Sequence, residues 1–229
     1  MLERLDRSFD AQRRFVANAS HELRTPLAVN RAMLEVAVGD PDVSDDLKRL
    51  APRLLATSER SERLVEGLLT LARAEQQVIE LAAVDVAHVA AAAVEQEQHE
   101  ALEHGVTVTT DLRPAPITGS PVLIERLAAN LVQNAVRHSP TGGEAIVRTG
   151  HTHAHSFLQT DNSGEVLRPT DIDGLFEPFR RGNGRASSRG VGLGLSIVRS
   201  VAHAHGGRVS AHPRRNGGLI VRVELPTHP

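Results

Sequence analysis

The chain has 229 residues, 40% of them hydrophobic, and a formal net charge of −2. It contains no cysteine, which excludes disulfides and thiolate metal sites, and the near-neutral charge gives no bulk field toward nucleic acid or an anionic membrane. Trp and Tyr are absent and aromatic residues make up only 2%, so a folded core must be built mainly from Leu, Val, Ile and Ala.

The N-terminal segment predicts a long amphipathic helix. Apolar side chains recur at a heptad spacing, with one polar position at Gln12: Leu2, Leu5, Phe9, Val16, Ala19 and Leu23. Pro26 should kink this helix because it lacks a backbone N–H, and the pattern then resumes to about Val38. The charged start is not a signal peptide, and no run reaches the roughly 20 apolar residues of a spanning helix, so we expect a soluble chain.

A second long helix follows a break at residues 39–41. Ser44 is a candidate N-cap, and a second heptad seam runs through Leu47, Leu50, Leu54, Thr57, Ser61, Leu64, Leu68 and Leu71. The two helices predict an antiparallel hairpin over residues 1–77. One hairpin leaves its seams half covered, so we expect two hairpins to form a four-helix bundle in a homodimer. Packing of the hairpin on its own C-terminal domain is the alternative.

Residues 78–229 predict a second domain in which helices and strands mix. We expect helices over residues 85–103, 120–138 and 191–204, with Ser120 as the N-cap of the second. Strands are expected over residues 106–111, 144–150, 154–160, 207–212 and 218–225. The pattern indicates an α/β sandwich with one sheet covered by helices on one face, and therefore an α+β chain overall.

The stretch FVANASHELRTPLA, residues 15–28, places a histidine beside a glutamate. His21 faces away from the seam, where a histidine is usually a solvated surface residue. Glu22 could accept a hydrogen bond from one ring nitrogen and leave the other free to attack. Thr25 lies one turn further on the same face, and Pro26 could let the helix bend. A nucleophile and a surface residue both remain open from these residues alone.

The stretch NLVQNAVRHS carries Asn130 and Asn134 one turn apart on an otherwise apolar helix. Asparagine is a poor core residue and a mediocre helix former, so two on one face indicate a polar cleft. Their carbonyl oxygens could hold Mg²⁺, with Asn134 as the metal-ligand candidate. Arg137 and His138 extend this face toward a phosphate. A plain hydrophilic helix side is the alternative.

The stretch RGVGLGLSIV, residues 189–198, leads into a predicted helix. Gly190, Gly192 and Gly194 would let backbone N–H groups approach phosphates at a positive helix N-terminus, although the spacing is neither GxGxxG nor a P-loop. Four arginines could neutralise phosphate charge: Arg180, Arg181, Arg185 and Arg189. A flexible turn is the alternative reading of the glycines.

Two further features are weaker. A side chain in DNSGEVL, residues 161–167, could read an adenine amino group, but such a stretch is more often a surface turn. His151, His153 and His155 alternate and would share one face of a strand. No acidic or sulfur ligand stands nearby, so a zinc site is not favoured.

In this order, these segments resemble a sensor histidine kinase over nearly the whole chain. FVANASHELRTPLA resembles the H box, with His21 as the phosphoacceptor, and NLVQNAVRHS resembles the N box. LFEPFRR resembles the F box, with Phe176 and Arg181, and RGVGLGLSIV resembles the G2 box, with Gly190, Gly192, Gly194 and Leu195. The resemblance implies a dimerisation and phosphotransfer hairpin over residues 1–77 and a Bergerat-type ATP-binding domain over residues 78–229.

One box departs from the family pattern. The nucleotide-reading turn commonly reads D-x-G-x-G, whereas this chain has DNSGEV from Asp161 to Val166. Counting back from Phe176 puts Asn162 at the aspartate position and Gly164 at the first glycine. Asp161 would then point to the opposite face of the strand. Asn162 could still accept a hydrogen bond from adenine, with a lower expected affinity for ATP.

The resemblance implies a histidine kinase that uses ATP and Mg²⁺. His21 would receive the γ-phosphoryl group with Glu22 as general base, and Thr25 would position water for a reverse phosphatase reaction. The phosphoryl group would pass to an aspartate of a response regulator. A membrane sensor is expected upstream of this cytoplasmic portion, with no nucleic-acid partner. The alternatives are a degenerate kinase that serves as a regulator-binding scaffold and a coiled-coil interaction module with a structural second domain.

Overall fold

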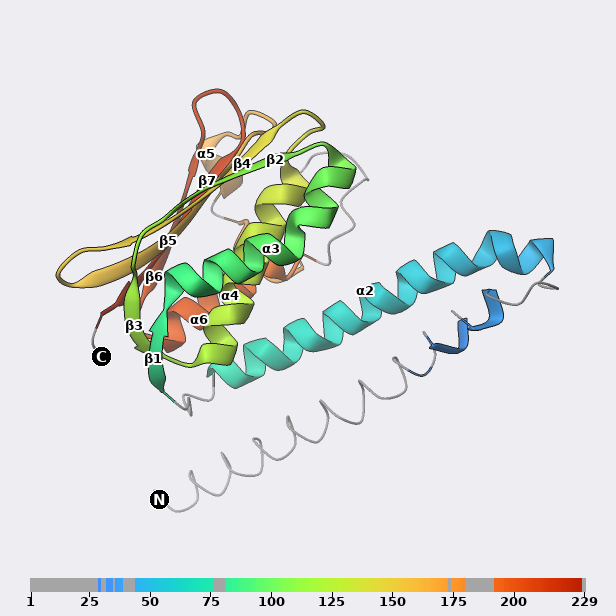
Figure 1. Cartoon of the computed structure of the whole chain (residues 1–229), viewed down its shortest axis with the longest axis horizontal. Coiled ribbons are helices and arrows are strands. Elements are labelled where there is room, and N and C mark those ends of the chain that lie inside the picture. The colour runs from blue at the N-terminus through green and yellow to red at the C-terminus, as the bar shows by residue number, and fades with distance from the viewer. Residues whose placement is uncertain are drawn as a thin grey trace, which may run out of the picture. The chain divides into compact units, whose positions relative to one another are not determined.

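A computed structural model describes residues 29, 32–34, 36–38, 44–75, 81–172, 174–179 and 192–227. They form two compact units, a helical one at the N-terminal side and a mixed α/β one that follows it (Figure 1). No helix within these residues is long and apolar enough to cross a membrane. The predicted fold class, a helical region followed by an α/β sheet domain, is confirmed.

The helical unit contains α2, Asp45–Glu75. Ser44 caps it as predicted, because the backbone N–H of Leu47 donates to Ser44 Oγ at 3.3 Å and so satisfies one of the free N–H groups of the first turn. Leu50 and Leu54 of the predicted seam are 47% and 46% exposed, so a single chain leaves this part of the seam uncovered. Most of the first predicted helix and the break at residues 39–41 lie outside the described residues.

The α/β unit is built on a five-stranded sheet with the strand order β2-β4-β5-β7-β6. These strands are β2 Thr107–Leu112, β4 Glu144–His151, β5 His155–Asn162, β6 Arg208–Pro213 and β7 Leu219–Pro226. β2 and β4 pair in parallel, and the other neighbours are antiparallel. A second, two-stranded ladder of β1 Ala82–Asp85 and β3 Pro116–Gly119 was not predicted, because four-residue strands show too little alternation to detect.

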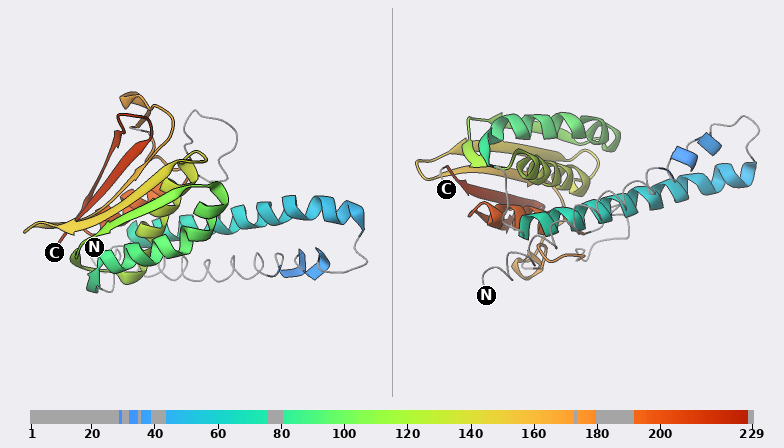
Figure 2. Two further views of the ribbon diagram at one scale, coloured as in Figure 1. Left: turned by 45° about the horizontal axis from the view of Figure 1, so that its top comes forward. Right: turned by 90° about the horizontal axis from the view of Figure 1, so that it is seen from below.

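Three helices cover one face of this sheet: α3 Val86–His104, α4 Pro121–His138 and α6 Gly194–Ala204 (Figures 1 and 2). The strands show why only one face is covered. In β7 every second residue from Leu219 to Leu225 is buried, and the residues between them stay partly exposed. A short helix, α5 Pro169–Ile172, follows β5. The predicted one-sided sandwich is therefore present.

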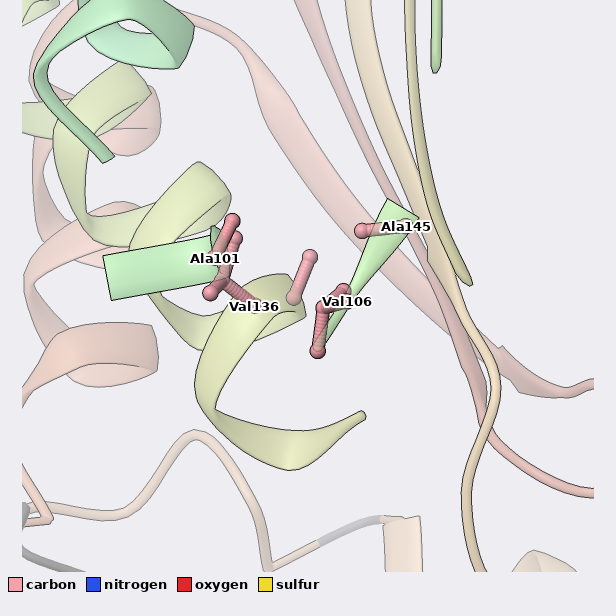
Figure 3. Packing of buried hydrophobic residues seen from close by; sticks show 5 residues of the cluster. Ala101, Val106, Val136 and Ala145 are labelled. Carbon is pink, nitrogen blue, oxygen red and sulfur yellow. The ribbon is translucent and has the colours of Figure 1, made fainter. Parts of the chain in front are cut away.

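Small side chains close the core near the C-terminal end of α4 (Figure 3). Ala101 of α3, Val136 of α4 and Ala145 of β4 pack together with Val106 and Ala135, and all are at most 6% exposed. Such side chains let the helices lie close to the sheet without aromatic filling. This packing holds the half of α4 that carries the predicted polar residues.

The three alternating histidines do not share a strand, in keeping with the two separate strands expected over residues 144–150 and 154–160. β4 ends at His151 and β5 begins at His155, which leaves His153 in the turn between them. Thr152 closes this turn, since its N–H donates to His155 O at 2.7 Å and its hydroxyl accepts from His155 N at 3.2 Å. Across the described part of the chain, no group of three His, Cys, Asp or Glu side chains is arranged to hold a metal.

Candidate nucleotide-binding site

The polar face of α4 consists of Asn130 and Asn134, both partly exposed on a helix whose other side is buried. Leu127 and Leu131 next to them are fully buried. Asn130 Nδ2 donates to the carbonyl of Arg126 at 2.7 Å, which orients the carboxamide and leaves Oδ1 as an acceptor. Two carboxamides beside a buried helix face, that of Asn130 held by a hydrogen bond, make a polar surface that is suited to a polar ligand.

The start of α6 lies against this face. A Cβ built on Gly194 would be 3.3 Å from Asn130 Oδ1, which is closer than side chains ordinarily approach. The N-cap residue Leu193 provides no side-chain hydrogen bond, so no side chain caps the first N–H groups of α6. Leu195 is only 8% exposed and anchors the helix in the core rather than facing a ligand. The structure therefore brings Gly194 and Asn130 together beside a helix N-terminus, which favours anions.

The segment between the F box and α6 is tied together at its two described ends. Phe179 N donates to Gly192 O at 2.9 Å, and both residues have positive φ, 65° and 79°. Phe176 is only 9% exposed and fixes the F box in the core. Arg181 and Gly190 lie between these ends, outside the described residues.

The end of β5 separates Asp161 from Asn162. Asn162 pairs with Leu219 and Ala145, which are buried under the helices, and it is itself 4% exposed. Asp161 lies on the opposite face of the sheet, where Arg148 Nη1 donates to it at 2.5 Å and Gln159 Nε2 at 2.7 Å. The structure therefore does not bring Asp161 to the face with Asn162. The two residues face opposite ways because successive side chains along a strand alternate between the two faces of the sheet.

The turn after β5 packs against the end of α4. A Cβ on Gly164 would lie 3.1 Å from the carbonyl oxygen of His138 and 3.5 Å from Asn162 Nδ2. Gly218, with φ 103°, lies so close to this turn that a Cβ would be 1.8 Å from Asn162 O. Sequence reasoning placed Gly218 at the start of the strand over residues 218–225 and missed this contact, although a glycine at a strand end is a signal of close approach.

Arg137 turns away from the asparagines toward α3. Its Nε and Nη2 donate to Glu100 Oε1 and Oε2 at 2.8 and 3.2 Å. These hydrogen bonds lower the pKa of Glu100, whereas burial and the nearby Glu100 charge raise the pKa of Glu97. Arg137 therefore links α4 to α3 through an ion pair, and the phosphate contact expected for it stays a prediction.

His138 ends α4, and its side chain is exposed. Loss of hydration from the surrounding protein, and then the charge of Arg137, lower the pKa of its imidazole and favour the neutral ring. A neutral ring can accept a hydrogen bond from a ligand, which the imidazolium cannot. The predicted phosphotransfer residues His21, Glu22 and Thr25 lie outside the described residues.

A five-stranded sheet with three helices on one face, a polar helix face and glycine turns beside it define an ATP-binding domain of the GHKL class. The family model "Histidine kinase-, DNA gyrase B-, and HSP90-like ATPase" matches residues 119–229. The model "His Kinase A (phospho-acceptor) domain" matches residues 11–77. The chain therefore belongs to the sensor histidine kinases and contains both domains of their kinase core.

Known proteins agree with this membership. "Sensor protein CutS" from Streptomyces coelicolor is 53% identical over 99% of this chain and 55% of its own length. "Sensor protein kinase PmrB" from Pseudomonas aeruginosa is 31% identical over 99% of this chain and 48% of its own length. Full-length ShkA, solved in complex with AMPPNP, shares the fold with a TM-score of 0.73 and 22% identity over 93% of this chain and 45% of that one. The chain spans about half the length of these curated relatives.

Proposed function

We propose that this chain is the ATP-dependent kinase core of a sensor protein and transfers the γ-phosphoryl group of ATP to His21. The observation that carries the proposal is the polar face of α4, where Asn130 Oδ1 lies against Gly194 at the start of α6. A phosphoacceptor domain that includes His21 and an ATPase domain that includes this face occur in one chain. The domain boundary is proposed near residues 77 and 78.

The nucleotide would lie between the two glycine-containing segments. Asn162 Nδ2 donates to Ser163 O at 2.8 Å, which leaves Oδ1 to accept from the amino group of adenine. Gly164 keeps the turn free of a side chain that would approach the base. At the other end, Gly192 and Gly194 would place backbone N–H groups near the phosphates, and Arg181 and Gly190 would complete that side.

Oxygen donors of the N box suit a hard divalent cation. Asn134 would hold Mg²⁺ through its carbonyl oxygen, with Asn130 in support, and the bound ion would neutralise phosphate charge. The carboxamides themselves are neutral, so the negative charge that attracts the cation must come mainly from the nucleotide. This donor set therefore fits a metal that arrives with ATP rather than one held by the protein alone.

The transfer itself needs little covalent chemistry from the protein. Glu22 would accept a hydrogen bond from one ring nitrogen of His21, so that the other nitrogen attacks the γ-phosphorus. A nitrogen–phosphorus bond forms, the bond to the bridging oxygen of ADP breaks, and ADP leaves. Positioning and charge neutralisation supply most of the catalysis. Thr25 would place a water molecule for the reverse phosphatase reaction.

The partners follow from the same assignment. The exposed seam residues Leu50 and Leu54 support a homodimer in which two hairpins form a four-helix bundle. A receiver aspartate of a response regulator would take the phosphoryl group from His21. Because the relatives are about twice as long, a membrane-anchored sensor would complete the protein and leave this core in the cytoplasm.

Incubation of the full chain with γ-labelled ATP and Mg²⁺ tests the proposal. Wild type should acquire acid-labile label, and His21→Ala should acquire none while it still binds ATP with unchanged affinity. Glu95→Gln, at an exposed position of α3 that has no role in the proposed reaction, serves as the control and should still be labelled. Label that persists in His21→Ala would rule out His21 as the acceptor, and a wild type that binds ATP without labelling would indicate a scaffold.

A further inference from the structure

The ring of His205 bridges the end of α6 and the start of α4. Its Nδ1 lies 2.8 Å from the carbonyl oxygen of Val201, and its Nε2 lies 3.0 Å from the backbone nitrogen of Ser120. A carbonyl can only accept and a backbone N–H can only donate, so both ring nitrogens have fixed roles. His205 must be neutral, with the proton on Nδ1 and the lone pair of Nε2 directed at Ser120.

Gly119 leaves the space that the ring of His205 occupies. A Cβ built on Gly119 would lie 2.9 Å from His205 Cδ2 and 3.1 Å from Nε2, so the ring occupies the space that a side chain would need. Ser120 is the N-cap residue of α4, but its side chain makes no capping hydrogen bond. His205 therefore provides the bond that attaches the start of α4 to a different helix.

The same two helices also approach each other closely at the other end of α6, where a Cβ on Gly194 would lie 3.3 Å from Asn130 Oδ1. The helices thus run antiparallel and meet at both ends of α6. A helix rises about 1.5 Å per residue, so a slide of α6 by one residue would move Gly194 away from Asn130 by that distance. Gly192 would move with it.

We propose that His205 is a positioning residue that sets the axial register of α6 on α4. Through that register it places Gly192 and Gly194 relative to Asn130, although it touches none of them. The inference rests on the proposed function, because the register matters for activity only if this face binds ATP. On this proposal the neutral ring of His205 contributes to nucleotide affinity although it lies remote from the phosphates.

Two substitutions of His205 differ in whether they can replace the hydrogen bond that Nε2 accepts from Ser120 N–H. Glutamine places an amide oxygen as many bonds from Cα as Nε2, so His205→Gln can still accept from Ser120 N–H. Asparagine reaches only as far as Nδ1, so His205→Asn loses that bond. His203→Asn, on the exposed side of the same turn, is the matched control. The full chain should be studied by calorimetric ATP binding, hydrogen exchange without nucleotide and ¹⁵N NMR of the histidine rings.

We expect His205→Asn to bind ATP about tenfold more weakly and to exchange the Ser120 amide faster, since a hydrogen bond to a partly buried N–H is lost. His205→Gln and His203→Asn should resemble wild type, and the wild-type ring should show the Nδ1–H tautomer. An Nε2–H tautomer, or equal ATP affinity of His205→Asn and wild type, would overturn the inference. A wild type that binds no ATP would instead overturn the proposed function, and the positioning role with it.

A second experiment holds even if His205→Asn folds poorly. Gly119→Ala places a methyl group against the ring and should weaken ATP binding in the same way as His205→Asn. In a His205→Ala background the ring is gone, so the added methyl group should cost little further affinity. If the losses of ATP affinity from Gly119→Ala and His205→Ala simply add in the double variant, then Gly119 acts independently of the ring, and the proposed contact is overturned.

Discussion

Replacing Glu97 with glutamine should stabilise this protein at alkaline pH. Glu97 Oε1 accepts from Gln133 Nε2 at 3.0 Å, but Oε2 is buried without a hydrogen-bond partner. Burial and the charge of Glu100 raise the pKa of Glu97 in the folded state. Protonation of Glu97 therefore favours folding, and that contribution is lost as the pH rises through the raised folded-state value. Above this pH the ionised carboxylate is a net cost.

The size of the effect follows from what glutamine changes. It keeps the oxygen that accepts from Gln133 and replaces the partnerless oxygen with a donor beside the carboxylate of Glu100. An unsatisfied buried polar group costs about 1–3 kcal/mol, and since Glu97 is only partly buried we take the lower end, about 1 kcal/mol. For a domain of this size that corresponds to a Tm about 2–4 °C higher.

Thermal unfolding of wild type, Glu97→Gln and Glu95→Gln across a pH series measures this difference. Glu95 is exposed on the same helix and provides the same chemical change without burial. The advantage of Glu97→Gln should be full at alkaline pH and vanish in acid, where wild-type Glu97 is protonated. Glu95→Gln keeps the Glu97–Glu100 pair, so its comparison with Glu97→Gln isolates the change at Glu97 together with its effect on Glu100. A Glu97→Gln protein no more stable than Glu95→Gln, or an advantage independent of pH, would refute the reasoning.

Four further substitutions test the site. Asn134→Ala should weaken ATP binding about tenfold with Mg²⁺ and much less without it; equal losses would contradict metal binding. Asp161→Ala leaves Arg148 without its carboxylate partner and should lower the free energy of unfolding by about 1–3 kcal/mol, with unchanged ATP affinity. Asn162→Ala should instead lower the affinity for ATP and the preference for ATP over GTP. Gly194→Ala should weaken ATP binding several-fold in calorimetry, because its methyl group meets an amide oxygen at 3.3 Å; unchanged binding would contradict a site at this helix start.

Local patterns predicted the elements of the chain well. The start of α4 at Pro121 and its end at His138 agree with the proline, glycine and serine signals around them, and Ser44 caps α2 as expected. Prediction failed where the signal was short or unusual. The ladder of β1 and β3 has four residues per strand, too few to show a periodic pattern.

For the site, the sequence supplied the residues and the fold supplied their partners. Motif order placed Asn130, Asn134 and the glycines in one domain, and the strand period set Asn162 and Asp161 on opposite faces. Sequence reasoning also directed Arg137 to a phosphate, but the folded chain pairs it with Glu100. An arginine at that helix position can reach either way, and only the packing of α3 beside α4 decides between them.

The sequence by itself determined periodicity, capping and the chemical types available, because these depend on residues within one or two helical turns of each other. The tertiary structure alone decided which groups meet across long separations. Ser120 and His205 are 85 positions apart, and Arg137 and Glu100 are 37 apart. No local propensity encodes such a contact, since it depends on how the helices pack on a shared sheet and on where glycine leaves room for a ring.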